Sequence, residues 1–279
     1  MMETAYDILK SLGYGLLALL LCWLARLLYT VNPARGRLDW KLLEARNPAA
    51  ALDAGGYFLA VILSLGGTIS WAVESPLEGA FQTVAFGLYA LLLLNASMWA
   101  ADWTYLKDLK LAQRIKDGSI GAGLLRAAHE AALGLVILGA SWGEADGMTI
   151  SVFWLLGQLL LAAAVKLWFK AAKVDLAAEL EKRNEAAAVS AAGVALGLGF
   201  MAWCSLSGEF LGWGRSIFDA VLYFAAGTAG IAGFRWAADL ALLPGATFRQ
   251  EVLKGNSAVG LLDAALTVGV AVLLTWCLI

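Results

Sequence analysis

Residues 43–51 read LEARNPAAA, and residues 180–188, which lie 137 positions later, read LEKRNEAAA. The same offset relates residues 99–102 to residues 236–239, since both read WAAD. No gap is needed across these stretches. A repeat at a fixed offset indicates that one structural unit is used twice, so this pattern predicts the architecture before any other feature of the chain.

The composition predicts that the unit is built for a membrane. The 279 residues are 61% hydrophobic and 15% charged, and the mean hydropathy is +0.74. A soluble domain is closer to about half apolar and about a quarter charged. Apolar runs of about 20 residues, enough to cross a bilayer, recur through the chain. We expect an all-α polytopic membrane protein with eight transmembrane helices near residues 11–30, 54–74, 79–101, 121–143, 149–170, 187–208, 215–238 and 257–278.

Basic residues gather in every second connection, after the first, third, fifth and seventh spans. The clearest are Arg35, Arg37, Lys41, Arg46, Lys107, Lys110, Arg114, Lys116, Lys170, Lys173, Lys182, Arg183, Arg249 and Lys254. The other connections are short and mostly acidic. Cytoplasmic loops carry the excess of Lys and Arg, so we expect both termini outside the cytoplasm. The net charge of −2 hides this difference between the two faces. The difference concerns membrane topology, and we expect no nucleic-acid partner.

Four polar residues occupy one equivalent position ahead of Ala- and Gly-rich spans. They are Asn47, Ser119, Asn184 and Asn256, which follow one another at nearly even intervals. Asn and Ser are favoured helix N-caps because the side-chain oxygen accepts an N–H of the first turn. Each unit is therefore a two-helix repeat with the same orientation. We expect four parallel copies in two pseudo-symmetric halves, residues 1–140 and 141–279, related by an axis along the membrane normal.

The charged lead-in, the Asn cap and the Ala-rich span resemble the YjfL-type inner-membrane family, a domain of unknown function (DUF350). Residues 44–51 and 181–188 carry the resemblance best, whereas the second and fourth copies depart from it at 117–119 and 254–256. The resemblance implies four two-span copies in a bacterial inner (plasma) membrane protein tied to envelope stress. It supplies no catalytic residue.

Several ionisable residues fall inside the predicted spans, where charge is costly and marks a functional candidate. Arg126 and Asp263 are equivalent positions of opposite charge, each seven residues past its cap. Glu130 shares the helix face of Arg126, and Asp53 lies six residues past the first cap. These residues predict either a polar pathway or anion site, or an ion pair that fixes how two facing halves dock. The sequence favours the ion pair, because paired charges are the usual form of buried charge.

Other polar groups lie near the membrane boundaries. Arg215 and Asp219 are spaced for an i,i+4 ion pair, and we expect no chemistry from them. Asp102 and Asp239 end the two WAAD stretches. We expect each of these aspartates to pair with a nearby basic residue.

The residues that most enzymes and metal proteins need are scarce. His129 is the one histidine, and Cys22, Cys204 and Cys277 lie in separate spans, so we expect no metal site and no disulfide. We find no phosphate-binding loop, dinucleotide fingerprint or nucleophile elbow. The sequence therefore predicts no cofactor and no enzyme activity.

Two functions remain open. The first is a small-ion or small-solute conduit with a polar cluster between the halves. The second is a non-catalytic envelope-stress or scaffold protein whose basic cytoplasmic face binds membrane lipids, a second copy of the chain or a membrane partner protein. Helix N-termini beside basic residues attract anionic headgroups, which supports the second function.

Overall fold

The computed structural model describes residues 2–31, 35–69, 75–142, 146–243 and 245–278, and all regular structure in these ranges is helical. Within these ranges eight helices are long and apolar enough to cross a membrane, which confirms the predicted all-α polytopic class. The long helices are α1 (Met2–Val31), α2 (Pro48–Ile69), α3 (Pro76–Trp103), α5 (Ile120–Ala140), α6 (Gly147–Ala172), α8 (Glu185–Leu206), α9 (Trp213–Leu242) and α11 (Ser257–Leu278). The short ones are η1 (Trp40–Glu44), η2 (Lys107–Leu109), α4 (Leu111–Lys116), α7 (Leu176–Glu181) and α10 (Phe248–Leu253).

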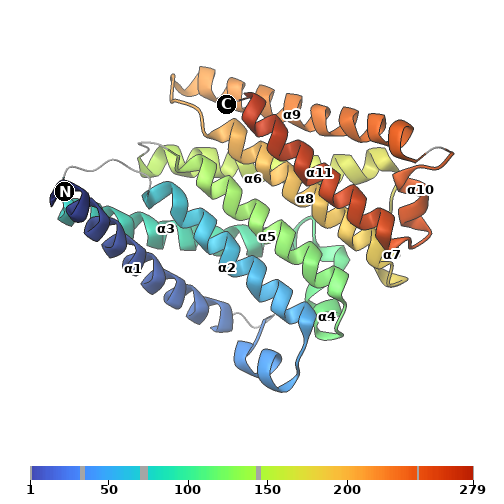
Figure 1. Cartoon of the computed structure of the whole chain (residues 1–279), viewed down its shortest axis with the longest axis horizontal. Helices are drawn as coiled ribbons and strands as arrows, with labels where there is room; N and C mark the ends of the chain where they lie inside the picture. The colour runs from blue at the N-terminus through green and yellow to red at the C-terminus, as the bar shows by residue number, and fades with distance from the viewer. Residues whose placement is uncertain (1, 32–34, 70–74, 143–145, 244, 279) are drawn as a thin grey trace.

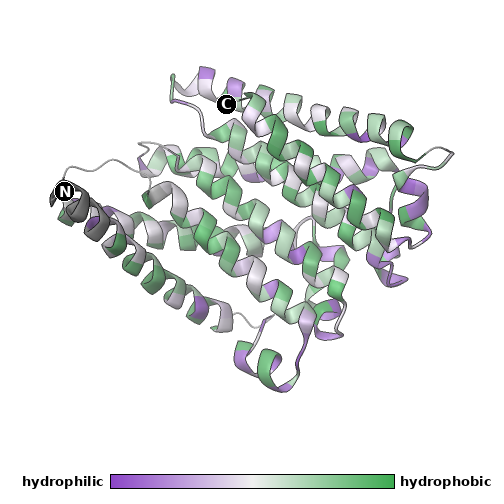
Figure 2. Cartoon of the chain, viewed as in Figure 1, coloured by the Kyte–Doolittle hydropathy of each residue, from purple (hydrophilic) through white to green (hydrophobic). Residues whose placement is uncertain are grey.

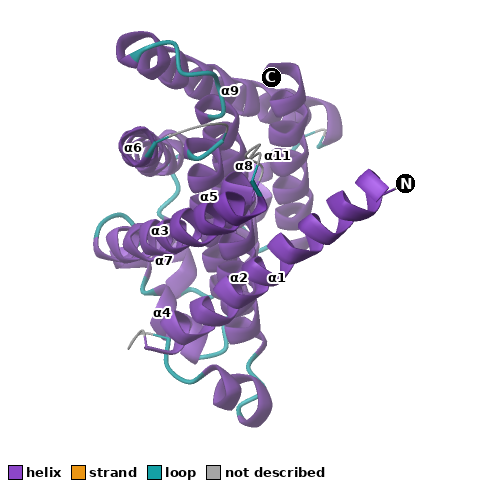
Figure 3. Ribbon diagram, turned by 90° about the vertical axis from the view of Figure 1, so that its left-hand side faces the viewer, coloured by secondary structure: helices purple, strands orange, loops and turns teal. Residues whose placement is uncertain are grey.

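The four helices that follow the polar caps form the centre of the molecule. Helices α2, α5, α8 and α11 pack side by side in that order and run parallel (Figure 1). Three other long helices form a second layer, in which α3 contacts α2 and α5, α6 contacts α5 and α8, and α9 contacts α8 and α11, while α1 packs against α2 and α3. Figure 3 shows α3, α6 and α9 along one side of this row. Most residues of α5 and α8 are buried because they lie in the middle of the row.

Small residues allow the row to pack this closely. A Cβ atom on Gly56 would meet the backbone of Ala127, and one on Gly193 would meet the backbone of Ala264. The second contact is the repeat equivalent of the first at both of its residues, so α2 packs on α5 as α8 packs on α11. Glycine at a helix contact lets two backbones approach directly, which explains the Gly and Ala content of the repeated stretches.

The contact between α5 and α8 uses both small residues and a carboxylate. A Cβ on Gly199 would lie 2.6 Å from Ala132 Cα. At the start of the same pair, the Glu185 carboxylate accepts the backbone N–H of Gly121 and, over 3.1 Å, the hydroxyl of Ser119. The first residue of α8 therefore binds the free N–H groups at the start of α5, where an anion also meets the positive end of the helix dipole.

A short helix, a left-handed residue and a cap precede each central helix. The left-handed residues are Arg46, Gly118, Arg183 and Gly255, with φ of 47°, 82°, 57° and 82°. After α4, α7 and α10, the N–H of the cap returns to the short helix over 3.0 Å. This is the Schellman ending, and its last residue is also the N-cap of the next helix. One tripeptide thus ends one helix and starts another.

The cap side chains also join successive units. Asn47 Oδ1 accepts from the N–H groups of Ala49 and Ala50, and its Nδ2 donates to Ile115 O over 2.8 Å. In the equivalent contact of the second half, Asn184 Nδ2 donates to Val252 O over 2.9 Å. The starts of α2, α5, α8 and α11 are therefore at one end of the bundle, which we call the cap end. The opposite end is the far end.

We predict that Arg183→Gly stabilises the protein by about 0.5–1 kcal/mol, because a left-handed backbone costs about 1–2 kcal/mol for a residue with a Cβ, partly offset by the larger entropy of glycine in the unfolded chain. The equivalent positions before α5 and α11 are already glycine. Thermal melting of the purified protein in detergent measures the effect. Lys182→Gly is the control, because Lys182 has right-handed φ and ψ, and this change should lower stability.

We predict that acid destabilises the junctions before α8 and α11. Hydrogen bonds from Lys182 and Asn184 lower the pKa of Glu179 below its ordinary value of 4.5, and those from Lys254 and Asn256 lower the pKa of Glu251 in the same way. A carboxylate whose pKa is lower in the folded protein than in the unfolded chain stabilises the fold at any pH above its pKa in the unfolded chain. That stabilisation is lost as the pH falls through the pKa that the carboxylate has in the folded protein. As the pH falls below 4.5, the melting temperature of the protein should therefore decrease.

Glu179→Gln and Glu251→Gln together test this pH dependence. The double variant should melt at a lower temperature near neutral pH and show a flatter decline on the acid side. If the melting temperature of the double variant fell at acid pH as steeply as that of the unaltered protein, the acid sensitivity would come from other carboxylates.

The outer surface of the bundle is apolar between its two ends. Figure 2 shows hydrophobic residues along the long helices and hydrophilic residues gathered at the short helices of the cap end. Large exposed side chains such as Leu16, Leu92, Leu159 and Trp276 lie on this surface, each more than half exposed. A surface of this kind is stable in lipid and not in water.

Candidate functional site

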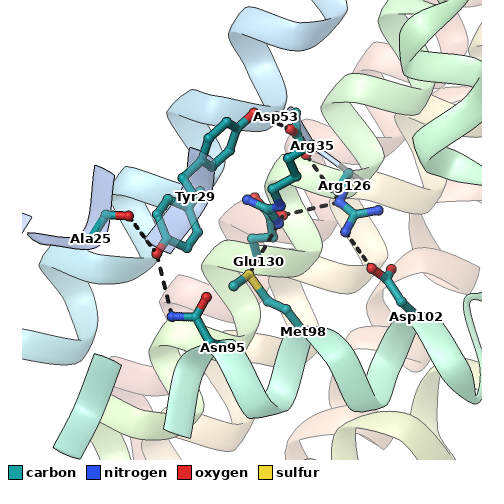
Figure 4. A network of polar contacts seen from close by, with 10 residues as sticks. Ala25, Tyr29, Arg35, Asp53, Asn95, Met98, Asp102, Arg126 and Glu130 are labelled. Atoms are coloured by element: carbon teal, nitrogen blue, oxygen red, sulfur yellow. Dashed lines mark hydrogen bonds and ion pairs between the residues drawn. The ribbon is translucent and has the colours of Figure 1, made fainter. Parts of the chain in front are cut away.

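Two of the four predicted intramembrane charges lie on α5. Arg126 and Glu130 are one turn apart, so they share a helix face. Both are buried, and Arg126 Nε lies 3.2 Å from Glu130 Oε1. Glu130 is ten residues past the start of α5, which places it about 15 Å into the bundle. The surrounding contacts are drawn in Figure 4.

Arg126 joins three helices through carboxylates. Its Nε lies 3.1 Å from Asp53 Oδ1 on α2, and its Nη2 donates to Asp102 Oδ2 on α3 over 2.6 Å. With Glu130 on its own helix, Arg126 has three anionic partners. The structure thus brings together three of the four predicted pathway or ion-pair candidates, Asp53, Arg126 and Glu130.

Arg35 enters the same site from the connection after α1. Its guanidinium pairs with Glu130 Oε1 and lies over the rings of Tyr29 and Tyr57, 4.8 and 4.9 Å from their centroids. Desolvated cation–π contacts of this kind are worth about 2 kcal/mol each. Tyr29 donates its hydroxyl to Asp53 Oδ2 over 2.6 Å (Figure 4). We call Arg35, Asp53, Asp102, Arg126 and Glu130 the charged cluster.

The charged cluster has hydrogen-bonding capacity that the protein does not use. In the described ranges, Glu130 Oε2 and the Nε and Nη1 atoms of Arg35 have no hydrogen-bond partner. The two side chains are 2% and 3% exposed, and unsatisfied buried polar atoms are rare in native proteins. Lys41 lies near the cluster on the cap-end side. Burial lowers the pKa of Lys41, and the charge of Asp53 opposes that shift.

The fourth candidate, Asp263, belongs to a separate and simpler site. Its Oδ2 lies 2.5 Å from Arg235 Nη2 on α9 and also accepts the hydroxyl of Ser190 on α8. The contact between Arg126 and Asp263, which the sequence left open, is therefore not formed, and the polar cluster lies within the first half instead of between the halves. The central helices form a row, and α8 packs against both α5 and α11, so equivalent positions on α5 and α11 do not face each other.

The remaining polar predictions have local roles. Arg215 Nε pairs with Asp219 Oδ2 over 2.6 Å as expected. His129 is buried, and its Nε2 lies 2.6 Å from the hydroxyl of Tyr105. Among the described residues, no group of three or more His, Cys, Asp and Glu side chains could hold a metal ion. The caps bind backbone groups at their helix starts, as described above.

Sequence reasoning missed three functional candidates. In the sequence, Arg35 stands out only as a topology-setting loop charge, and Asp102 only as a boundary residue. Arg235 lies inside the predicted span 215–238 and is an intramembrane charge like Arg126. The sequence did contain a signal for Arg235, because its equivalent in the repeat is the uncharged Met98. In the structure Met98 borders the charged cluster, with its Sδ 3.3 Å from Arg35 Nη2.

Comparisons with known proteins agree with this architecture. The model of a protein family, Domain of Unknown Function (DUF350), matches residues 3–141 and 143–278. It aligns as two segments of four long helices each, whereas the sequence pattern predicts four two-span copies. A UPF0719 transmembrane protein of Aquifex aeolicus (strain VF5) is 24% identical over 237 residues, which are 82% of this chain and 85% of the relative. No solved structure gives a significant match. The chain is therefore a member of the DUF350 family of membrane proteins.

Proposed function

We propose that the protein is a conduit for protons or small cations, and that its ion site is the charged cluster. We also propose that residues 1–140 and 141–279 are two copies of one four-helix unit, of which only the first holds this site. The observation that supports the proposal is the comparison of the two copies. Their central helices pack in the same register, through Gly56 on Ala127 and Gly193 on Ala264.

The second copy shows that this packing does not need five charges. At the positions equivalent to the charged cluster the second copy has Ala172, Ser190, Asp239, Asp263 and Thr267. One ion pair, Arg235 with Asp263, replaces the network there. Buried charges are costly even when paired, so charges beyond those needed for docking point to a function. On this ground we prefer a functional role for the charged cluster over the purely structural ion pair that the sequence favoured.

The charge balance favours a cation over an anion. Three carboxylates face two guanidinium groups, so the cluster has one excess negative charge when every member is ionised. The unpartnered Glu130 Oε2 is the atom that an incoming proton or cation would bind. Glu130 is the key residue, since it contacts both arginines.

An apolar layer separates the charged cluster from the far end. Leu21, Leu65 and Leu91 are buried on α1, α2 and α3, and a Cβ on Gly87 would lie 2.5 Å from Leu21 and 3.1 Å from Leu65. Leu65 is twelve residues past Asp53, or about 18 Å further along α2. Hydrophobic constrictions gate channels by excluding water, so we propose that ions reach the cluster only from the cap end, where the Asp102 side chain is 30% exposed.

Flux through proteoliposomes tests the proposal. Imposed gradients of H⁺, Na⁺ and K⁺ should reveal flux for at least one cation with the unaltered protein. Glu130→Gln should lower that flux by about tenfold or more while the protein still elutes as a folded species. Asp263→Asn is the matched control, because it alters the second copy's ion pair and should leave flux unchanged. The absence of flux under all three gradients would overturn the proposal.

The cap end is proposed to face the cytoplasm of a bacterial inner membrane, with both termini outside. The basic connections at the cap end support this orientation. In a chain without its native cysteines, an impermeant maleimide should label Gly208→Cys on intact cells and should label Lys110→Cys only after permeabilisation. The opposite pattern would reverse the orientation.

A second candidate function is binding of anionic lipids or a membrane partner at the cap end. Arg46 and Arg183 favour it, because both keep a left-handed backbone where glycine would be less strained, and such strain gathers at functional positions. Native mass spectrometry should then show fewer bound anionic lipids on the double variant that carries Arg46→Gly and Arg183→Gly than on the unaltered protein. Lipid loss without any cation flux would favour this candidate.

A further inference from the structure

The far end of the second half contains a cavity of about 980 Å³ that the charged cluster does not explain. It lies among the ends of α5, α8 and α11 and the beginnings of α6 and α9. Ligand sites usually measure about 300–1,000 Å³, so this volume suits a small organic molecule. Phe153, Ser205 and Leu206 form part of its buried lining, whereas Trp142 and Tyr223 on the cavity are each 45% exposed.

The walls of the cavity are aromatic. Trp142, Phe153, Phe210 and Tyr223 line it. Phe153 and Phe210 meet edge to face with centroids 6.4 Å apart, and Trp213 contacts both rings, with centroid distances of 6.4 Å to Phe153 and 5.0 Å to Phe210. Packed rings have fixed orientations, so their π faces are available to a ligand without further ordering.

The charged groups on the cavity are acidic. Glu209 and Asp219 line it, and none of its described lining residues is Lys or Arg. Arg215 pairs with Asp219, which leaves the charge of Glu209 in excess. Carboxylates beside aromatic faces are the arrangement that binds organic ammonium groups, and the lack of a basic lining residue disfavours phosphates and carboxylates as ligands.

The equivalent positions of the first half lack most of these groups, although Tyr223 corresponds to Phe86. Asp219 corresponds to Gln82, and Phe153 corresponds to Leu16. Thr149 donates its hydroxyl to Asp146 at the N-terminus of α6, and it corresponds to Leu12. The acidic and aromatic character is therefore not required by the helix packing that the two halves share.

We propose that this cavity binds an organic cation with an apolar or aromatic substituent, whose ammonium group lies against Glu209 and Asp219 and whose apolar part lies among Trp142, Phe153 and Phe210. The site is separate from the charged cluster, because Glu130 lies about 15 Å from the cap end near the middle of α5, whereas the cavity lies at the far end and is lined mostly by the second half.

Tryptophan fluorescence of the full chain in maltoside micelles tests the site, with Trp142 as the reporter. Benzyltrimethylammonium is the probe, and benzenesulfonate has a similar shape with the opposite charge. The cation should give a saturable change that the anion does not give. Glu209→Gln should weaken the Kd by about threefold to tenfold, and it leaves the Arg215–Asp219 pair intact.

Two control variants make the result specific. Glu78→Gln removes an exposed carboxylate in the first turn of α3, outside the cavity, and should leave the Kd unchanged. Glu130→Gln should also bind normally, which separates this site from the proposed conduit. The proposal is overturned if the cation gives no saturable change, if benzenesulfonate binds equally well, or if Glu78→Gln weakens binding as much as Glu209→Gln.

Discussion

Replacing Gly56 with leucine should prevent the protein from folding, and alanine at the same position should already lower the free energy of unfolding by about 3 kcal/mol. The reason is the contact across α2 and α5, where a Cβ would lie 2.9 Å from Ala127 O and closer still to the backbone carbon of that residue. A backbone cannot rotate away as a flexible side chain can, so the two helices would have to separate along the row.

Gly55 supplies the control within the same helix turn. A Cβ on Gly55 meets no atom within 4 Å, so Gly55→Ala should be neutral or gain up to about 1 kcal/mol from helix propensity. Gly193→Ala should repeat the loss in the second half. Size-exclusion profiles and thermal melting in detergent measure both effects. Equal behaviour of the alanine variants at positions 55 and 56 would show that close backbone approach does not limit stability.

Arg126→Ala should lower stability by about 3–5 kcal/mol, because it leaves Asp53, Asp102 and Glu130 together without their shared cation. Arg35 would still neutralise Glu130, so the largest penalty falls on Asp53. Thermal melting measures the loss. A change of less than about 1 kcal/mol would mean that water already screens the cluster.

A grafted variant separates this structural effect from function. It replaces the cluster with the residues of the second half, which requires Arg35→Ala, Asp53→Ser, Met98→Arg, Arg126→Asp and Glu130→Thr. The graft should recover most of the stability lost in Arg126→Ala, because it recreates the pair seen between Arg235 and Asp263. It should also abolish cation flux. A graft that conducts normally would show that the charged cluster has only a packing role.

The sequence predicted the helices and their starts because both depend on local chemistry. Apolar length determines the spans, and the oxygen of Asn47 or Asn184 binds N–H groups only two or three residues away. The neighbours of each helix could not be predicted in this way. Arg126 and Asp263 are equivalent in the repeat, but the packing of α8 between their helices follows from where the Gly and Ala faces meet.

The charged cluster shows the same limit. Four of its members lie in or near predicted spans, and their separation along the chain does not reveal that Arg126 contacts the other three. Arg35 is harder to predict, because it follows a span instead of lying within one. Its burial depends on the rings of Tyr29 and Tyr57, whose proximity exists only after α1 and α2 have packed.

The cap amides also give the chain an order of assembly during synthesis. Asn47 donates to Ile115 O, and Asn184 donates to Val252 O, in both cases 68 residues further along the chain. At a translation rate of about 5–20 residues per second, each amide waits about 3–14 s for its acceptor to emerge. Asn184 also donates back to Glu179, but within the described residues the amide of Asn256 donates only back, to Glu251. The earlier units remain incomplete until a later one arrives, whereas the last unit completes its cap from its own short helix.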